Sequence, residues 1–290
     1  MKLNAKLNVV MLAVFSVGLL VSGYLSYTIL NTNARKVVLE QATLLMDAAT
    51  AVQGYTSDEV APELSPHINR KFLPQVVAAY AATQTLGRLT SGYADYSYKE
   101  ATLNPTNARD KAFEWEADLV ERFRRGEAER QIIGTRPTTE GDSLYLARPI
   151  KISEESCLAC HGDPADAPKS MLAQYGPANG FGWQLNEIVG ARIVSVPLSA
   201  SLEQARQAFF VFMALMVVMF ATFIIVLNTM LKRMVISPAA TMSEIADEVS
   251  KGNLDVPAFE ARGDDEMSTL AASFNRMRRS LEKAMRMLER

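Results

Sequence analysis

Cys157-Leu158-Ala159-Cys160-His161 is the most informative stretch of this chain. The spacing C-x-x-C-H is the attachment sequence of a c-type haem, in which two thiols bond to the porphyrin and the adjoining imidazole becomes the proximal iron ligand. The 290-residue chain has only two cysteines and two histidines, and this motif uses both cysteines and one histidine. We therefore predict one covalent haem c, with Cys157 and Cys160 as its attachment points and His161 as an iron ligand.

Three other interpretations of the motif can be compared with this one. A thioredoxin-like C-x-x-C opens a helix, whereas Gly162-Asp163-Pro164 follows here and disfavours a helix. A structural zinc site needs four nitrogen or sulfur ligands, and outside the motif only His67 remains. A disulfide between the two cysteines stays open as an alternative, although it would leave His161 without a role.

Two apolar segments, Val9–Leu30 and Ala208–Leu231, contain no charged residue. Each is long enough to cross about 30 Å of hydrocarbon at about 1.5 Å per residue. Lysines precede the first segment and Lys232-Arg233 follows the second, which by the positive-inside bias predicts cytoplasmic termini. The first apolar run is too long for a signal peptide and lacks a small-residue cleavage site after it, so we expect an uncleaved anchor.

These spans divide the chain into five predicted parts. They are a cytoplasmic N-terminus (1–8), a first transmembrane helix (9–30), a periplasmic domain with the haem motif (31–207), a second transmembrane helix (208–231) and a cytoplasmic segment (232–290). Covalent haem attachment takes place outside the cytoplasm, so the protein is expected in a bacterial inner membrane, in contact with lipid. No basic stretch suggests nucleic-acid binding, and the formal net charge is only -2.

The periplasmic segment predicts a mixed α+β domain. Apolar spacing and breaker residues predict helices over 35–60 and 75–86, and a third from an Asn104-Pro105 N-cap to Gly126. Residues rich in β-branched and aromatic side chains predict a hairpin of strands 131–135 and 144–152, with a third strand at 188–196 beside it. The loop 153–187 carries the haem motif, so we expect the haem on a loop held by an antiparallel sheet and covered by the early helices.

Several separated runs resemble one known family. They are Tyr98–Asn107, Ala147–Pro149, Glu155–Pro164 and Phe181–Trp183. They are similar to the PAS-like, c-type-haem sensor domain found on the periplasmic side of bacterial chemoreceptors and sensor kinases, and in some free-standing cytochromes. The resemblance covers most of residues 35–198. It implies a PAS-like sheet, dimerisation and a role in redox or small-ligand sensing.

The ligand opposite His161 decides whether the haem favours electron transfer or ligand binding. Members of the resembled family use a cysteine on the helix after the anchor, but this chain has no further cysteine. Met46 is the candidate on that helix, because small residues surround it, with core packing as the alternative. His67 is a second candidate, or else a surface histidine, and Met171 is a third. Arg70 and Arg148 are candidate partners of the haem propionates, with ordinary solvation as the alternative. The candidate walls of the haem pocket are aromatic, with core packing as the alternative: Tyr55, Tyr145, Phe181 and Trp183.

The segment after the second span predicts two helices with a heptad seam. Apolar residues recur at three-four spacing in 237–250 and again in 267–288, and Gly252–Pro257 breaks the pattern between them. This arrangement is similar to a HAMP domain, a dimeric parallel four-helix bundle that relays motion between membrane and output domain. A plain dimerising amphipathic helix is the alternative.

Three functions from different classes are consistent with these features. The first is a transmembrane haem sensor of redox state or a small ligand that signals, as a homodimer, through the HAMP relay. The second is a membrane-anchored cytochrome that passes electrons to a partner complex. The third is a peroxidase-like enzyme, for which the sequence offers no distal acid–base pair, so no enzymatic activity is expected. No nucleotide-binding motif appears, so we expect either a separate output protein of the kinase or chemoreceptor type or a chain that is shortened here.

Overall fold

The computed structural model describes residues 3–288 except 94, 140, 254, 260–262 and 264. The chain divides into two compact units. Residues 26–209 form one unit, here called the α+β unit, and residues 1–25 with 210–290 form the other, here called the helical unit. The haem motif belongs to the α+β unit.

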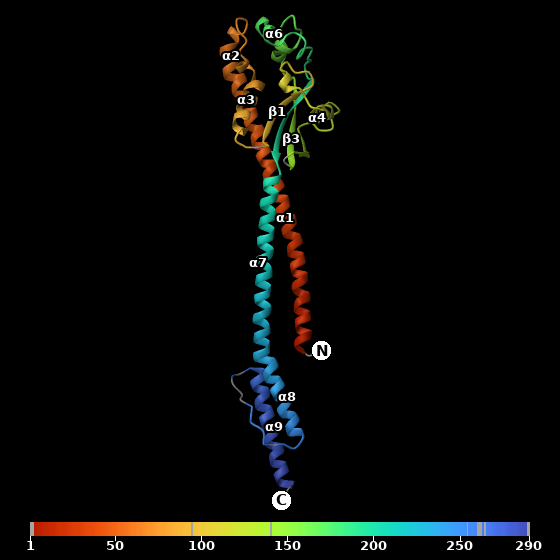
Figure 1. Ribbon diagram of the computed structural model, residues 1–290, viewed down its shortest axis with the longest axis vertical. Coiled ribbons are helices and arrows are strands. Elements are labelled where there is room, and N and C mark those ends of the chain that lie inside the picture. Colours follow the sequence, from red (N-terminus) through yellow and green to blue (C-terminus); the bar gives the residue numbers. More distant parts are fainter. Residues whose placement is uncertain are drawn as a thin grey trace. The chain divides into compact units, whose positions relative to one another are not determined.

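Helix α1 (Leu3–Tyr55) runs without interruption from the first apolar segment into the α+β unit (Figure 1). The sequence predicted a span followed by a helix from residue 35, and the structure joins the two because residues 31–37 contain neither proline nor glycine. A π-helical turn, η1 (Thr56–Val60), follows α1. The chain continues through α2 (Ala61–Leu64) and the 3-10 turn η2 (Ser65–His67), each with a proline in its first turn.

The centre of the α+β unit is a four-stranded antiparallel sheet in the order β1-β4-β3-β2. The strands are β1 (Ser97–Thr102), β2 (Ile132–Thr138), β3 (Gly141–Lys151) and β4 (Ile188–Pro197). The predicted hairpin and the strand packed beside it are therefore confirmed as β2, β3 and β4. Strand β1 was not predicted and lies at one edge, paired with β4.

Side chains alternate between the two faces of this sheet and form two cores. Helices α1 and α3 (Ala78–Thr90) cover one face, and α4 (Glu114–Arg124) covers the other (Figure 1). The first core cluster comprises Val38, Ala42, Met46, Ala49, Ala82, Leu86, Tyr98, Leu144, Leu146, Val194, Val196 and Leu198. The second core cluster comprises Ala101, Leu119, Val120, Phe123, Ile132, Ala147, Ala191 and Ile193.

Helix α4 begins at Glu114, so the prediction of an N-cap at Asn104-Pro105 was wrong. The Glu116 carboxylate accepts a hydrogen bond from the backbone N–H of Phe113 (2.8 Å) and satisfies a donor at the start of the helix. Lys99 of β1 neutralises the same carboxylate, with Nζ at 2.6 Å from Oε2. Residues 104–112 instead contain the 3-10 turn η4 (Ala108–Asp110) and an isolated bridge from Lys111 to Thr102.

The connection between β3 and β4 carries the haem motif on short helices. The turn η5 (Glu155–Cys157) leads directly into α5 (Leu158–His161), and α6 (Lys169–Tyr175) follows after a proline-containing turn. A further 3-10 turn, η3 (Pro74–Val76), precedes α3. The motif therefore lies on a helical turn in the long loop that the sequence predicted.

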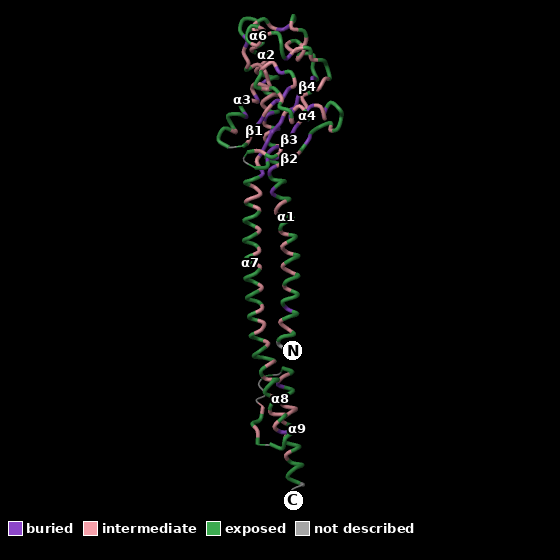
Figure 2. The backbone as a smooth tube through the Cα atoms, turned by 45° about the vertical axis from the view of Figure 1, so that its right-hand side comes forward, coloured by how far each residue is buried: buried purple, intermediate pink, exposed green. Residues whose placement is uncertain are grey.

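The helical unit contains most of α7 (Ser199–Leu231), then the π-helical turn η6 (Lys232–Ile236), α8 (Ser237–Ser250) and α9 (Glu266–Leu288). Two helices, Ala5–His67 and Ser199–Ser250, are long and apolar enough to cross a membrane, by length and composition. Their most apolar windows are only 11% and 0% buried (Figure 2). Phe15 of α1 stacks on Phe220 of α7 with ring centroids 5.1 Å apart.

Several side chains of α9 contact the connector between α8 and α9, and one of them, Arg278, donates from Nη1 to the carbonyl of Val256. Asn275 accepts a hydrogen bond from the N–H of Phe259 (3.1 Å) and donates one to its carbonyl (2.9 Å). The Phe259 ring also packs edge-on against Phe274, with centroids 5.4 Å apart. The two helices predicted after the second span are confirmed, and Leu270 and Met277 of the predicted seam are more than half exposed in the single chain.

Candidate functional site

The imidazole of His161 is fixed on three sides. Its Nδ1 lies 2.7 Å from the carbonyl oxygen of Gly180 and 3.5 Å from Oγ1 of Thr106, and its ring stacks on Trp183 with centroids 4.1 Å apart and planes 14° apart. Because a carbonyl can only accept, Nδ1 carries the proton and Nε2 keeps a lone pair. This is the arrangement by which proteins orient a metal-binding histidine.

Gly180 can occupy its position only because it has no side chain. Its φ is +83°, and a Cβ there would lie 2.0 Å from Oγ1 of Thr106 and 2.7 Å from the Thr106 backbone nitrogen. Two backbone hydrogen bonds hold the following residues against the motif, from Gly182 N–H to the Gly162 carbonyl (2.9 Å) and from Trp183 N–H to the His161 carbonyl (3.1 Å). The segment 180–183 therefore supports the imidazole as a rigid unit.

The two thiols are free and half-buried, one helical turn apart from each other and next to His161. Burial raises the pKa of the Cys160 thiol, and the neighbouring Cys157 raises it further. Burial lowers the pKa of His161, partly offset by its hydrogen bond to Gly180. An imidazole with a free Nε2 beside two free thiols fits the donor set that a c-type haem requires.

The structure places the other predicted residues in four surroundings. Trp183 contacts His161, and Phe181 is half-buried in the same segment. Tyr55, His67 and Arg70 are exposed at and after the end of α1. Met46 is fully buried in the first core cluster and Met171 is buried in α6. Tyr145 packs against Trp115 and over Gly134 on the α4 face of the sheet.

The segment that contains His67 contacts the loop of the haem motif. The hydroxyl of Ser170 in α6 donates a short hydrogen bond to the carbonyl of Ile68. Phe72 packs edge-on against Tyr175 of α6, with centroids 5.7 Å apart. Residues 67–72 and α6 thus form one packed surface within the α+β unit.

Arg148 faces α1, where its Nη1 donates to Oδ1 of Asp47 at 2.8 Å. Arg192 of β4 lies opposite Arg148 of β3 in the strand register. Nη1 of Arg192 donates to Oε1 of Gln53 at 2.8 Å. Gln53 in turn donates to the buried carboxyl of Glu100 (2.6 Å). Arg148 was predicted from the sequence as a propionate partner, together with Arg70, but Arg192 was not. Alternation along β4 indicates which face Arg192 takes, but only the strand register brings Arg148 and Arg192 together.

Gly180 and Thr106 are the site residues that the sequence analysis did not assign. Thr106 lies in one of the runs on which the family resemblance was based, Tyr98–Asn107, and Gly180 directly precedes another, Phe181–Trp183. No local pattern joins them, because 74 positions of the chain separate residue 106 from residue 180. Their contact follows from the way β1 and the loop after β3 meet at one end of the sheet.

Comparison with known families supports this description of the chain. The profile of the Tll0287-like family matches residues 31–197. The chain belongs to the Tll0287-like family. A HAMP domain profile matches residues 230–283, which follow the Tll0287-like match and begin within the second candidate membrane helix, Ser199–Ser250.

A solved structure similar to this chain is described as the crystal structure of the cyanobacterial heme-protein Tll0287. The identity is 15%, the TM-score is 0.38, and the match covers 57% of this chain and 94% of that one. A search of curated proteins found no match.

Proposed function

We propose that this protein is a membrane-anchored sensor that carries one covalent haem c and passes a conformational signal through its HAMP domain to a separate output protein. Cys157 and Cys160 would attach the porphyrin, and Nε2 of His161 would bind the iron. A candidate span, the Tll0287-like domain, a second candidate span and the HAMP domain follow one another along the chain. An electron carrier has no use for a HAMP relay, which favours sensing.

The single observation that carries the haem proposal is the fixation of His161. Its Nδ1 is engaged by the Gly180 carbonyl at 2.7 Å, so Nε2 is oriented before any metal binds, and the thiols of the motif lie on the same turn. When bound, the haem would supply an iron whose oxidation state or free axial position responds to the surroundings. The protein's part is to hold the imidazole in one orientation and one tautomer.

Met46 and His67 are our candidates for the axial position opposite His161. Met46 lies in the first core cluster, where its burial is also explained by packing. His67 is exposed, and its segment packs against α6 beside the haem motif, which favours His67. Met46→Leu removes the sulfur at nearly constant volume, so absorption spectra of this variant and of His67→Ala distinguish the two candidates.

We further propose that the Tll0287-like domain is periplasmic, that both termini are cytoplasmic, and that the protein works as a homodimer. Basic residues flank the cytoplasmic sides of both apolar segments. Leu270 and Met277 of α9 are 54% and 58% exposed in the single chain, and a second α8–α9 pair would cover them. A dimer transmits a haem-dependent change as a shift between two arrangements of the bundle.

The haem is tested by mass spectrometry of the mature full-length protein. We expect one added haem in the wild type and none in a Cys157→Ser/Cys160→Ser variant. A wild-type polypeptide of unmodified mass would refute the proposal. Fast electron exchange with a soluble cytochrome, without any change in the HAMP domain, would indicate an electron carrier instead.

Signalling is tested by cross-linking in membranes. A Leu270→Cys variant should form disulfide-linked dimers at a rate that differs between oxidised and reduced haem. Thr269→Cys, one position away and off the seam, is the matched control and should respond weakly. A Leu270→Cys rate that is the same in both haem states would refute the sensor function while leaving the haem in place.

A further inference from the structure

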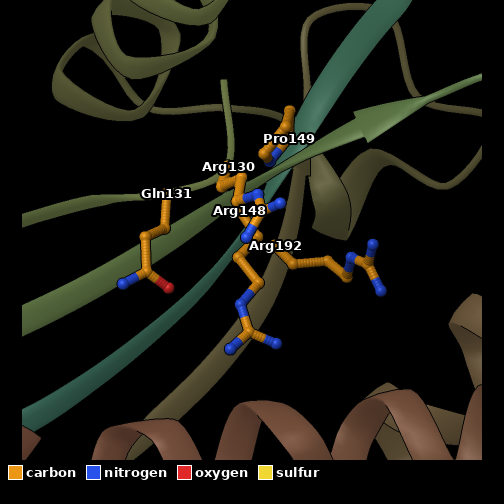
Figure 3. A pocket seen from close by; sticks show the side chains of 5 residues that line it. All are labelled: Arg130, Gln131, Arg148, Pro149 and Arg192. Carbon is orange, nitrogen blue, oxygen red and sulfur yellow. The ribbon is translucent and has the colours of Figure 1, made fainter. Parts of the chain in front are cut away.

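Three arginines surround a cavity of about 510 Å³ on the α1 face of the sheet (Figure 3). Arg148 of β3 and Arg192 of β4 are register partners, and Arg130 lies just before β2. Figure 3 shows the three side chains close together, above a helix. Such a concentration of guanidinium groups is costly without a negative partner, since like charges repel.

The described residues supply too little negative charge for these arginines. Asp47 pairs with Arg148 at 2.8 Å, but its side chain is 58% exposed. Arg192 is bonded to a neutral amide, Gln53, and its buried Nε has no hydrogen-bond partner among the described residues. Arg130 forms no ion pair with any residue in the described part of the chain.

The acid opposite Arg192 on the neighbouring strand, Glu100, is poorly suited to balance its charge. Glu100 stands opposite Arg192 in the register of β1 and β4, but burial raises its pKa, so it holds its proton more readily than an exposed carboxyl does. Its Oε1 is already engaged by the hydroxyl of Tyr98 (2.7 Å) and by Gln53 (2.6 Å). A buried guanidinium nitrogen therefore remains without an acceptor, and such groups normally have one.

We propose that this cavity binds a carboxylate group, held by Arg148 and Arg192 with Arg130 at its edge, and that the bound carboxylate replaces Asp47 as the partner of Arg148. A guanidinium presents two parallel N–H groups that match the two oxygens of a carboxylate. The carboxylate has two sources with the same chemistry, a small free organic acid or a propionate of the haem. The second source rests on the proposed function, whereas the first does not.

The site would also connect the ligand to α1. Asp47 and Gln53 are the α1 residues that bond the two arginines, and α1 is the helix that continues into the first candidate span. A carboxylate that takes Arg148 from Asp47 removes a contact between the sheet and α1. Ligand binding and the position of α1 are then linked, and the linkage acts in both directions.

The test uses the full-length haem protein and calorimetric titration with succinate. For a free acid, we expect saturable binding that weakens roughly 10- to 100-fold in Arg148→Gln and in Arg192→Gln, because each removes a charge-assisted hydrogen bond. Arg125→Gln is the matched control, since Arg125 is exposed and pairs with Glu127 away from the cavity. If Arg192→Gln does not fold, Arg192→Lys should bind more weakly than wild type, because an ammonium cannot form the two-pronged contact.

A substitution that removes a negative charge distinguishes binding in this cavity from a general effect of the protein's net charge. Asp47→Asn removes the competing carboxylate and should tighten succinate binding several-fold. Glu40→Gln removes an exposed carboxylate of the same helix that pairs with Lys36, and should leave binding unchanged. Equal tightening in both variants would overturn the proposal.

The haem source is tested in the same proteins by the dependence of the haem midpoint potential on pH. The carboxylate is a haem propionate if succinate does not bind and if Arg148→Gln and Arg192→Gln shift the pH at which the haem midpoint potential changes. Arg125→Gln should leave that pH unchanged. If neither succinate binding nor the potential responds to these variants, the proposal is overturned. Absence of haem in the mass spectrum would refute the proposed function alone, because the succinate titration remains valid.

Discussion

Gly180→Ala tests whether the support of His161 is as tight as the structure indicates. The new Cβ would lie 2.0 Å from Oγ1 and 2.7 Å from the backbone nitrogen of Thr106, at a φ of +83°. A residue with a side chain at such a φ costs about 1–2 kcal/mol. Overpacking adds about 1–3 kcal/mol, and rotation of the Thr106 hydroxyl cannot relieve the contact with its backbone.

Gly182→Ala is the matched control for this substitution. Gly182 has a φ of +77° and nothing within 4 Å of its would-be Cβ, so it carries the backbone cost without the collision. Gly180→Ala should therefore be less stable than Gly182→Ala by about 1–3 kcal/mol, which corresponds to about 2–12 °C in melting temperature for a domain of this size. Thermal unfolding followed by circular dichroism measures the difference.

A second measurement follows the hydrogen bond to His161. Displacing the Gly180 carbonyl weakens its bond to Nδ1 and makes the imidazole a poorer donor to iron. The haem midpoint potential of Gly180→Ala should therefore be more positive than that of Gly182→Ala. Equal melting temperatures and equal potentials in the two variants would refute the reasoning.

Three other substitutions give separate tests. Burial raises the pKa of Glu100 above its ordinary 4.5, so the folded protein loses stability as the pH rises from about 4.5 through the folded-state pKa. Glu100→Gln should reduce this loss, which is measured as the difference between the unfolding free energies at about pH 5 and pH 8. An unchanged pH dependence in this variant would contradict the prediction. Met46→Ala should lower the free energy of unfolding by about 2–5 kcal/mol, because the Met46 side chain is fully buried. Leu44 is 71% exposed, so Leu44→Ala should change the free energy of unfolding little. Equal denaturation midpoints of the two variants would contradict the packing of Met46. Asn275→Ala loses both hydrogen bonds to Phe259, so limited proteolysis should cleave the connector faster in this variant than in the wild type. Equal cleavage rates would count against the attachment.

Strands and helices with a strong local pattern could be predicted from the sequence. The hairpin β2–β3 and strand β4 are rich in β-branched side chains, and α9 has a heptad seam. Strand β1 was missed because Lys99-Glu100-Ala101 favours no strand by itself. It becomes a strand because each of its residues pairs with β4.

The candidate site likewise combines residues that a local sequence pattern predicts with residues that only the fold brings together. Cys157, Cys160 and His161 could be predicted because their chemistry depends on adjacent positions. The support by Gly180 and Thr106 could not, since it depends on contacts 19 and 55 positions from His161. The arginine cavity likewise needs the register that places Arg148 opposite Arg192.

The π-helical turn η6 has a mechanical consequence for the second candidate span. Helix continues through residues 232–236 into α8 without a loop, so torsion about the helix axis is not dissipated at the junction. In a continuous helix, each residue added or removed rotates everything after it by about 100°. A π turn holds one residue more than an α turn. A change of residues 232–236 from a π turn to an α turn would therefore rotate the apolar seam of α8 about the helix axis in one discrete step.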